Sequence, residues 1–441
     1  MSGQLMLLGE ARERVLAAIA GPLSPERVAT ADALGRVAAE DVVAQVALPP
    51  FDNSAMDGYA IRAADVAGAS EEAPVSLRVV GESKAGDRGS SDVTAGAAVR
   101  IATGAPLPPG ADAVVPVEQT TPVDADGRAG SRGRDATGPL PAACLVHVSV
   151  PVGASIRRKA EDVGVGSLVV AAGRAMTPSA IALAAGSGNA EVVVHRRPRV
   201  AVLATGDEIE PPGAPLGPGS LPDANGPGLR ALVADAGAEA VDLGIARDRL
   251  EDVRERLLSG IAGADAIVVS GGVSVGPYDV VKLAFDELGR IDLWRVAVQP
   301  GKPFAFGSAA ASDGRTVLLF GLPGNPVSSF VTFELFVRPA IRRLAGHGRL
   351  WRPVDRAIMT EAVHKSEGRR AFIRVVAERD DDGRPRRDDQ GRVRVGRAGG
   401  QGSHVLSGLV AAEALAVIPE EGDRADAGDE VELWWLADSG A

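Results

Sequence analysis

Cysteine and aromatic residues are scarce in this chain of 441 residues. Cys144 is the only cysteine, so no disulfide can form within the chain, which is typical of a protein from a reducing compartment. The five histidines lie far apart, and no Cys/His group has the spacing of a zinc site. Because aromatic residues make up only 3% of the sequence, we expect a core of aliphatic side chains.

Positive charge and long apolar runs are also lacking. The 47 Lys and Arg residues are outnumbered by 58 Asp and Glu, which gives a net charge of −11. Nucleic acid and anionic membrane surfaces would repel such a chain at long range, so we expect neither as a partner. An anionic ligand would need a local cationic pocket. No apolar run is long enough to span a bilayer and no basic leader is present, which predicts a cytoplasmic protein.

The hydrophobic pattern changes twice along the chain. From residue 27 to 152, short β-like runs alternate with Gly and Pro turns, which predicts a β-rich region. From about residue 177 to 345, helical and strand-like segments alternate, which predicts a parallel sheet covered on both faces. After residue 352, β-like runs return. The expected fold class is therefore α/β plus β, a multidomain chain with a central parallel-sheet α/β domain, a β-rich domain in the N-terminal half and a C-terminal β domain.

Three strands of the central region run into glycine-rich loops. Ligands bind outside the carboxyl ends of the strands in an open parallel sheet, so we expect these loops to meet at one rim. They are Thr-Gly-Asp-Glu at 205–208, Ser-Gly-Gly-Val-Ser-Val-Gly at 270–276 and Gly-Leu-Pro-Gly-Asn-Pro at 321–326. The expected strands are 199–204, 240–243, 266–270 and 316–320, and the expected helices are 179–185, 228–236, 250–259, 278–288 and 326–344.

The loop at 270–276 can bind an anion. Its glycines allow the backbone N–H groups to approach a ligand closely, and Ser270 and Ser274 add hydroxyl donors. Asp279 and Lys282 follow at the start of the next helix, about one turn apart. The alternative is a tight strand-to-helix turn in which glycine serves packing alone.

Other candidate groups are less specific. Asp207 and Glu208 can reach a divalent cation bound to phosphates, or they can cap a helix or lie in a solvated turn. Lys302 can place a charge beside an anion or be simply solvated. Pro323 and Pro326 stiffen a loop, for structural reasons or to position a ligand. Polar segments around Asp57 at 49–60 and Thr103 at 101–108, and a charged cluster at 157–162, are equally compatible with rigid turns and a solvated face.

No histidine is placed to serve a Ser or Cys nucleophile, and neither a Walker loop nor a dinucleotide-binding fingerprint is present. The chemistry suggested by these residues is therefore the positioning of anions and metal.

Taken together, six motifs in register closely resemble the molybdopterin molybdenumtransferase (MoeA) family, which is related to the E domain of gephyrin. They are Phe-Asp-Asn-Ser-Ala-Met-Asp-Gly-Tyr-Ala at 51–60, Arg-Ile-Ala-Thr-Gly-Ala-Pro at 100–106, the three glycine-rich loops, and Pro-Gly-Lys-Pro at 300–303. The resemblance covers almost the whole chain. It implies an elongated homodimer of four-domain subunits, in which molybdate is inserted into adenylylated molybdopterin and AMP is released, with Mg²⁺ as the expected metal.

The resemblance also implies domain bounds and partners. Residues 1–25 and 176–345 would form the MogA-like molybdopterin-binding α/β domain, 26–46 and 148–175 a linker and dimerisation domain, 47–147 the β-rich domain and 346–441 the C-terminal β domain. A molybdopterin adenylyltransferase would act upstream, and molybdoenzymes would receive the product.

Roles are implied for individual residues. The phosphates of the pterin would be held by Ser270, Gly271, Gly272, Ser274, Gly276 and Lys282, together with Asn325 and Ser328. The metal would be held by Asp207, Glu208 and Asp279. Pro323 and Pro326 would lie on the molybdate side of the cleft, and Lys302 would be a further catalytic residue. Asp57 and Thr103 would come from the partner subunit, and Asp162 from the intervening domain.

The sequence departs from the family at four positions. Gln299 replaces a common lysine, Ala180 a glutamate, Ala160 a glycine before Glu161, and Ala224 a hydroxyl residue. The cationic contribution from position 299 and the acidic one from position 180 are therefore in question. Two other functions stay open at this point: adenylylation of molybdopterin, and a non-catalytic dimeric scaffold that binds a partner peptide.

Overall fold

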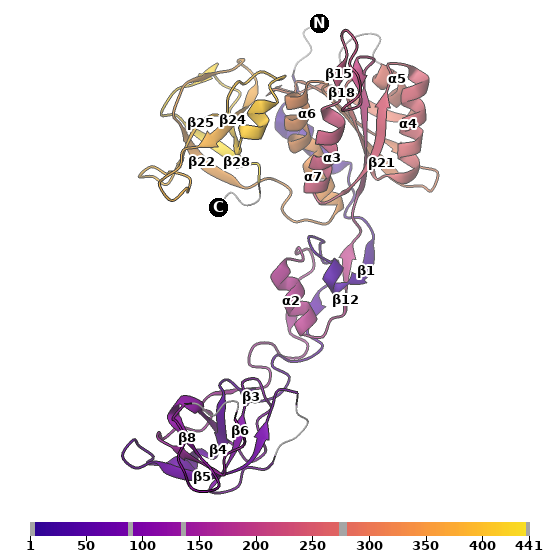
Figure 1. Ribbon diagram of the computed structural model, residues 1–441. Coiled ribbons are helices and arrows are strands. Elements are labelled where there is room, and N and C mark those ends of the chain that lie inside the picture. Colours follow the sequence, from indigo (N-terminus) through magenta and orange to yellow (C-terminus); the bar gives the residue numbers. More distant parts are fainter. Residues whose placement is uncertain (1–4, 87–90, 134–137, 273–279, 438–441) are drawn as a thin grey trace.

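The structure is a computed structural model that describes residues 5–86, 91–133, 138–272 and 280–437. Figure 1 shows an elongated molecule, with a β-rich domain at one end, a small domain in the middle, and an α/β domain beside a C-terminal barrel at the other end. Within these described ranges, no helix combines the length and apolar character needed to cross a membrane.

The α/β domain is built on a six-stranded sheet in the order β16-β13-β17-β21-β20-β18. Its strands alternate between two cores: Val200 and Val202 of β13 face one, and Ala201 and Leu203 the other. Helices α1, α3, α6 and α7 supply the first core, and α4 and α5 the second. This two-sided burial explains the continuous apolar runs of the central strands. The elements are α1 (Leu8–Ala17), β13 (Arg199–Thr205), α3 (Asn225–Asp235), β16 (Glu239–Ala246), α4 (Leu250–Gly263), β17 (Ala266–Ser270), α5 (Val280–Leu288), β18 (Gly289–Arg295), β20 (Pro303–Ala310), β21 (Thr316–Leu322), α6 (Pro326–Thr332), the π-helical η4 (Phe333–Val337) and α7 (Arg338–Leu344).

The expected α/β architecture is confirmed, with two differences. The sheet is not entirely parallel, because β20 runs antiparallel to both β18 and β21. Strands β18 and β20 were not expected from the sequence. Short connections without a crossover helix join β18 to β20 and β20 to β21, which is the connection that antiparallel neighbours permit.

The helix expected at 179–185 forms as α2 (Pro178–Gly186), but it does not cover the six-stranded sheet. It packs in a separate core with Met176, Val192 and Val194, so by packing the segment before residue 199 belongs to the small domain instead of the α/β domain. A pattern of alternating elements does not tell which sheet a helix covers. The small domain contains β1 (Pro25–Ala29) paired with β12 (Glu191–His195), β2 (Val42–Val43) paired with β11 (Leu168–Val170), and the 3₁₀ turn η1 (Thr30–Asp32).

The β-rich domain has its own six-stranded sheet, in the order β7-β4-β6-β5-β9-β8, and its own core around Tyr59, Leu77 and Cys144. Beside it, β3 (Asn53–Ser54) pairs with β10 (Ile156–Arg157). The other elements are β4 (Gly58–Ile61), η2 (Ala63–Val66), β5 (Val75–Ser83), β6 (Ala97–Ile101), β7 (Ala113–Pro116), η3 (Val117–Gln119), β8 (Thr120–Val123) and β9 (Ala143–Val146).

The C-terminal domain is a closed barrel. Strand β24 pairs with both β25 and β26, which closes the ring β24-β25-β22-β28-β26. Its elements are β22 (Val354–Met359), β23 (Val363–His364), β24 (Arg370–Ala377), β25 (Val393–Arg397), α8 (Ser407–Ala411), β26 (Ala414–Ile418), β27 (Arg424–Ala425) and β28 (Glu430–Trp435). Closure leaves no free sheet edge in the ring.

The barrel and the α/β domain share packing. Phe372, Leu415 and Trp434 of the barrel belong to the same core as Phe336, and β19 (Val298–Gln299) of the α/β region pairs with β24. A buried ionic group adds to this junction: Arg352 donates to Glu334 at 2.9 Å and to Asp235 at 2.7 Å. Burial disfavours the charge of Arg352, but the hydrogen bond and charge of Glu334 outweigh it and raise its pKa.

Candidate functional site

A cavity of about 740 Å³ lies at the carboxyl ends of β13, β17 and β21. We call it the first cavity. This is where an open α/β sheet places its ligands. It is lined by Ala204, Thr205, Gly206, Glu208, Ile209, Leu221, Pro222, Asp223, Ala224, Asn225, Asp248, Ser270, Gly271, Gly272, Pro303, Pro323, Gly324, Asn325, Pro326, His404 and Leu406. Residues 209 and 221 begin two short paired strands, β14 (Ile209–Glu210) and β15 (Leu221–Pro222).

Hydrogen bonds join the loops around this cavity. Asn225 at the start of α3 donates from Nδ2 to Ser270 Oγ and to the carbonyl of Gly324, both at 2.7 Å. Gly271 N donates to Leu322 O at 3.1 Å, and Ser270 Oγ lies 3.3 Å from Ser329 Oγ. The loops that follow β17 and β21 are thus held together, as the strand-end positions predict.

Two glycines of the 270–276 loop are required by local packing. Gly271 has φ +98°, and a Cβ there would lie 2.7 Å from Thr205 Oγ1. Gly272 has φ +62°, and a Cβ there would lie 2.3 Å from Val281 Cγ2. No larger residue fits at either place, whether or not a ligand binds. Because both glycines line the first cavity, they also bring bare backbone to its wall.

Carboxylates gather at one side of the first cavity. Glu208 and Asp248 line it, and Asp207 accepts from the backbone N–H of Asp248 at 3.1 Å. Partial burial, together with the charges of Asp207 and Glu208, raises the pKa of Asp248. Asp223 also lines the cavity, but its Oδ1 accepts from Gly226 N at 2.8 Å and so caps α3. A cation placed here would relieve the repulsion among the first three groups.

The described residues alone do not build a complete metal cage. No group of three or more His, Cys, Asp or Glu side chains within them could hold a metal ion. Ser274, Gly276 and Asp279 lie outside the described residues, so Asp279 is not placed relative to Asp207 and Glu208.

The structure divides the other candidates between two places. Pro323, Asn325 and Pro326 line the first cavity. Lys282 is exposed on α5 and does not line it. Ser328 lines a second cavity, of about 620 Å³, between the α/β domain and the barrel.

The second cavity is rich in cations. Besides Ser328, Gln299 and Gly301 it is lined by Arg369, Arg397, His364 and Ser403, among others. Lys302 lies between Gly301, which lines the second cavity, and Pro303, which lines the first. The charge of Arg295, then burial and the charge of Arg369, lower the pKa of Lys302. Gln299 accepts from Ser366 N at 2.8 Å through Oε1, a bond that a lysine side chain could not accept.

Asp57 and Thr103 lie together but away from both cavities. The Oδ1 of Asp57 accepts from Thr103 N at 2.7 Å and from its Oγ1 at 3.0 Å. Both residues belong to the β-rich domain, which Figure 1 shows at the far end of the molecule from the α/β domain. Asp162 is exposed in the segment beside that domain, where its N–H donates to Leu48 O. None of the three reaches the first cavity within one chain.

Several residues of the first cavity were missed by the sequence reasoning. Asp223 and Asn225 flank Ala224, which was considered only as a departure from the family, and Asp248 was not predicted as a site residue. His404 and Leu406 come from the barrel, and no sequence pattern signals their approach. It depends on how the barrel packs against the α/β domain.

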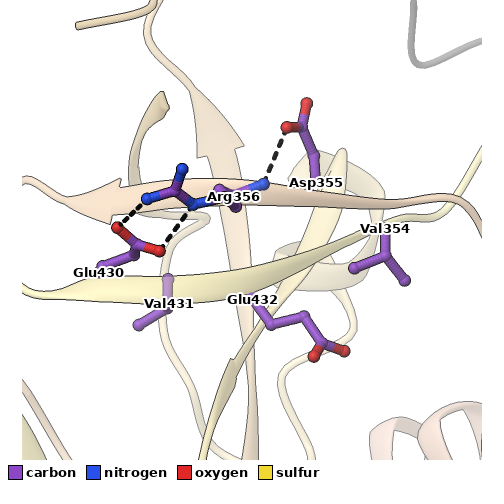
Figure 2. Close-up of a pocket in the computed structure, with 6 residues that line it drawn as sticks. All are labelled: Val354, Asp355, Arg356, Glu430, Val431 and Glu432. Carbon is purple, nitrogen blue, oxygen red and sulfur yellow. Dashed lines mark hydrogen bonds and ion pairs between the residues drawn. The ribbon is translucent and has the colours of Figure 1, made fainter. Parts of the chain in front are cut away.

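Another hollow, of about 560 Å³, lies on the outside of the barrel and has different chemistry (Figure 2). Its charged groups already have partners: Arg356 donates twice to Glu430 at 2.7 Å. The guanidinium of Arg356, helped by Arg392, holds the pKa of Glu430 at about 2. With its charges paired, this hollow offers little to a charged ligand.

Comparison with known proteins gives the family. Residues 6–188 match the MoeA N-terminal region (domains I and II), 201–343 a probable molybdopterin binding domain, and 356–436 the MoeA C-terminal region (domain IV). The chain is 35% identical to a molybdopterin molybdenumtransferase of Haemophilus influenzae, over 97% of this chain and 98% of that protein. It is 38% identical to molybdopterin molybdenumtransferase 2 of Mycobacterium tuberculosis, over 96% of this chain and 98% of that one.

A solved structure agrees with these relatives. The molybdopterin biosynthesis MoeA protein of Pyrococcus horikoshii superposes with a TM-score of 0.75 at 31% identity, over 98% of this chain and all of that one. The chain therefore belongs to the MoeA family of molybdopterin molybdenumtransferases, enzymes of molybdenum cofactor biosynthesis.

Proposed function

We propose that this chain inserts molybdate into adenylylated molybdopterin, releases AMP and so produces molybdenum cofactor. The observation that carries the proposal is the meeting of three strand-end loops on the first cavity. A cavity of about 740 Å³ is within the range of small-molecule sites.

The residues of the cavity suit a reaction that depends on positioning. The pterin phosphates would lie against the backbone of Ser270, Gly271 and Gly272, where the two glycines carry no side chain and allow a ligand to approach closely. Asn225 holds this loop against the 321–326 loop, so both walls keep one geometry. Molybdate and the dithiolene of the pterin can then be held next to each other without a covalent bond to the protein.

The second cavity suits molybdate, the other anionic substrate. Arg369 and the neighbouring Lys302 concentrate positive charge in an acidic protein, whereas Arg397 is paired with Glu361 at 2.6 Å. Molybdate would lie on this side, where Ser328 lines the cavity.

Mg²⁺ fits the carboxylates of the first cavity. Burial first, and then the charges of Asp207 and Glu208, raise the pKa of Asp248, and a bound cation would favour its ionised form. Mg²⁺ usually takes one or two carboxylates and completes its shell with water and phosphate oxygens. Asp207, Glu208 and Asp279 would supply the protein ligands, and the bound ion would neutralise phosphate charge on the substrate.

A homodimer would complete the site. Asp57 and Thr103 are joined to each other but lie far from the first cavity of their own chain. They can therefore meet such a cavity only in a second subunit, with Asp162 from the segment between. We place the enzyme in the cytoplasm, after a molybdopterin adenylyltransferase and before the molybdoenzymes that receive the cofactor.

The proposal is tested with purified protein, adenylylated molybdopterin, molybdate and Mg²⁺. We expect AMP release and a product that activates a molybdoenzyme, and a cofactor-deficient strain should regain nitrate reductase activity with this chain but not with Asp279→Asn. If no AMP is released, the proposal is wrong. Incorporation of labelled ATP into the pterin by this chain alone would indicate the adenylylation step instead.

The dimeric site has its own test. Asp57→Asn and Asn225→Ala each alter one half of the proposed site, so each variant alone should lose at least about nine-tenths of the activity. Mixed dimers formed by co-expression should regain activity, because one of their two sites contains both unaltered halves. Absence of recovery in confirmed mixed dimers would mean that Asp57 acts within its own chain or not at all.

A further inference from the structure

The first cavity is poorly matched in charge to a polyanionic substrate. Three carboxylates line it, on Glu208, Asp223 and Asp248. Among the described residues of its lining there is no lysine or arginine, and His404 is the one side chain able to carry positive charge. Mg²⁺ would offset part of this negative charge, and a cationic side chain on the protein would add a charge-assisted hydrogen bond to the phosphate.

The imidazole of His404 is available for such a contact. His404 is exposed, and within the described part of the chain its ring makes no hydrogen bond or ion pair. Other histidines are engaged: His195 Nδ1 lies 2.9 Å from Leu23 O, and His147 Nε2 lies 2.9 Å from Thr121 Oγ1.

The backbone that carries His404 is fixed from both sides. On the barrel side, the buried Arg374 donates to Gly400 O at 2.6 Å and to Gly402 O at 3.2 Å. The side chain of Gln401 also pairs with the backbone N–H and carbonyl of Arg374, each at 3.0 Å.

On the α/β side, Val327 N donates to Ser403 O at 3.2 Å. This contact lies next to Pro326 in the wall of the first cavity. A residue whose backbone is fixed in this way can make a directed contact at low entropic cost.

We propose that His404 is a substrate-contacting residue, contributed by the barrel, that donates a charge-assisted hydrogen bond to a phosphate of the nucleotide part of the substrate. The inference rests on the proposed function, because it assumes that a phosphorylated nucleotide occupies the first cavity. It assigns the barrel a direct part in substrate binding.

The test measures the binding of AMP and of adenosine to the full chain, with Mg²⁺, by calorimetry. Loss of one charge-assisted bond predicts that His404→Gln, whose amide can donate only a neutral hydrogen bond, binds AMP about tenfold more weakly. Adenosine has no phosphate, so its affinity should not change. His404→Arg should restore AMP binding, because a guanidinium donates to phosphate as well. In the insertion assay, His404→Gln should raise KM for adenylylated molybdopterin far more than it lowers kcat.

Arg384→Gln is the matched control. It removes a positive charge from the same domain at an exposed position, where Arg384 forms only a surface ion pair with Asp382. It should leave AMP affinity unchanged.

Each other outcome has a distinct meaning. Equal weakening of AMP and adenosine would overturn the inference, because it would indicate a structural effect. Unchanged AMP binding by His404→Gln would also overturn it, while leaving the proposed function intact. If the unaltered chain binds no AMP and releases none in the insertion assay, it is the proposed function that fails.

Discussion

The Nδ2 of Asn225 donates to the Oγ of Ser270 over 2.7 Å, across 45 residues of sequence. The same amide donates to Gly324 O at 2.7 Å. One side chain therefore ties α3 to both glycine-rich loops of the first cavity. Ser270 is buried, so its hydroxyl has little access to water as a replacement partner.

We expect Asn225→Ala to lower kcat/KM for cofactor formation at least tenfold, because the loops lose their common donor. Stability should fall by about 1 kcal/mol, because the buried Ser270 hydroxyl loses a partner while the exposed Gly324 carbonyl can bond to water. Asn189→Ala is the control. Asn189 also donates to backbone carbonyls, at Val43 and Ala184, but lies in the small domain. It should reduce stability without changing activity, and equal activity losses would contradict a local role of Asn225.

Ala160 has φ +63°, in the left-handed region that favours glycine. This explains in physical terms why a glycine is common at this position in the family. Ala160→Gly should raise the free energy of unfolding by about 0.5–1 kcal/mol. The same exchange in the middle of helix α3, Ala231→Gly at an exposed site, should lower it by about 1 kcal/mol. Thermal unfolding of both variants measures these opposite changes in stability. If both variants become more stable, or both less stable, the explanation is wrong.

Ala180 is the third residue of α2, and its N–H donates to Oγ1 of the N-cap residue Thr177 at 3.2 Å. A glutamate here would complete a capping box by reaching back to the N-cap backbone. Ala180→Glu should therefore stabilise the small domain by roughly 0.5 kcal/mol and leave activity unchanged. Ala182→Glu is the control, because residue 182 is two positions further along the same helix and its side chain cannot reach back to the N-cap, so it should not stabilise the domain. Increased activity of Ala180→Glu would contradict this structural role.

Asp248 gives a pH prediction. Its pKa is raised in the folded chain, so the folded state binds this proton more tightly than the unfolded state does. The ionised group therefore costs stability at neutral pH, and the cost disappears as the pH falls through the raised folded pKa and below the unfolded value near ~3.9. Asp248→Asn should melt higher than the unaltered chain at pH 7 and equally at low pH. If the two proteins differ in melting temperature by the same amount at all pH values, the ionised carboxylate of Asp248 does not cost stability.

Glu334 is buried and pairs with Arg352, while Arg338 Nε lies 3.7 Å away. Glu334→Gln would remove the buried carboxylate and leave Asp235 as the remaining carboxylate partner of Arg352. We expect a loss of about 3 kcal/mol in the free energy of unfolding. Glu430→Gln on the barrel surface removes the exposed partner of Arg356 and should cost little. Denaturant unfolding compares the two, and similar losses would mean that burial does not set the strength of these pairs.

Much of the α/β domain was predictable, because its strands bury both faces. The continuous apolar run of Ala266–Ser270 identified β17 from sequence alone. Strand β20 was not recognised, since glycine and small residues at 305–310 give it little β-propensity, and its pairing with β21 defines it.

The site was predictable where strand ends determine it. The loops at 205–208, 270–272 and 321–326 were expected to meet, and the described parts line one cavity. Ser328 was expected with the phosphates, but it faces the second cavity, because it is two residues further along α6 than Pro326. His404 depends on the packing of the barrel, which involves residues far apart in sequence.

The small domain pairs outgoing chain with returning chain, β1 with β12 and β2 with β11. The β-rich domain is therefore connected to the α/β domain by two chain segments that are hydrogen-bonded to each other, and not by a single flexible linker. Such a connection resists twisting, since both strands would have to turn together. The distance between Asp57 and the α/β domain of its own chain therefore depends on the length of both segments, so an insertion in either one would move Asp57 relative to a partner subunit.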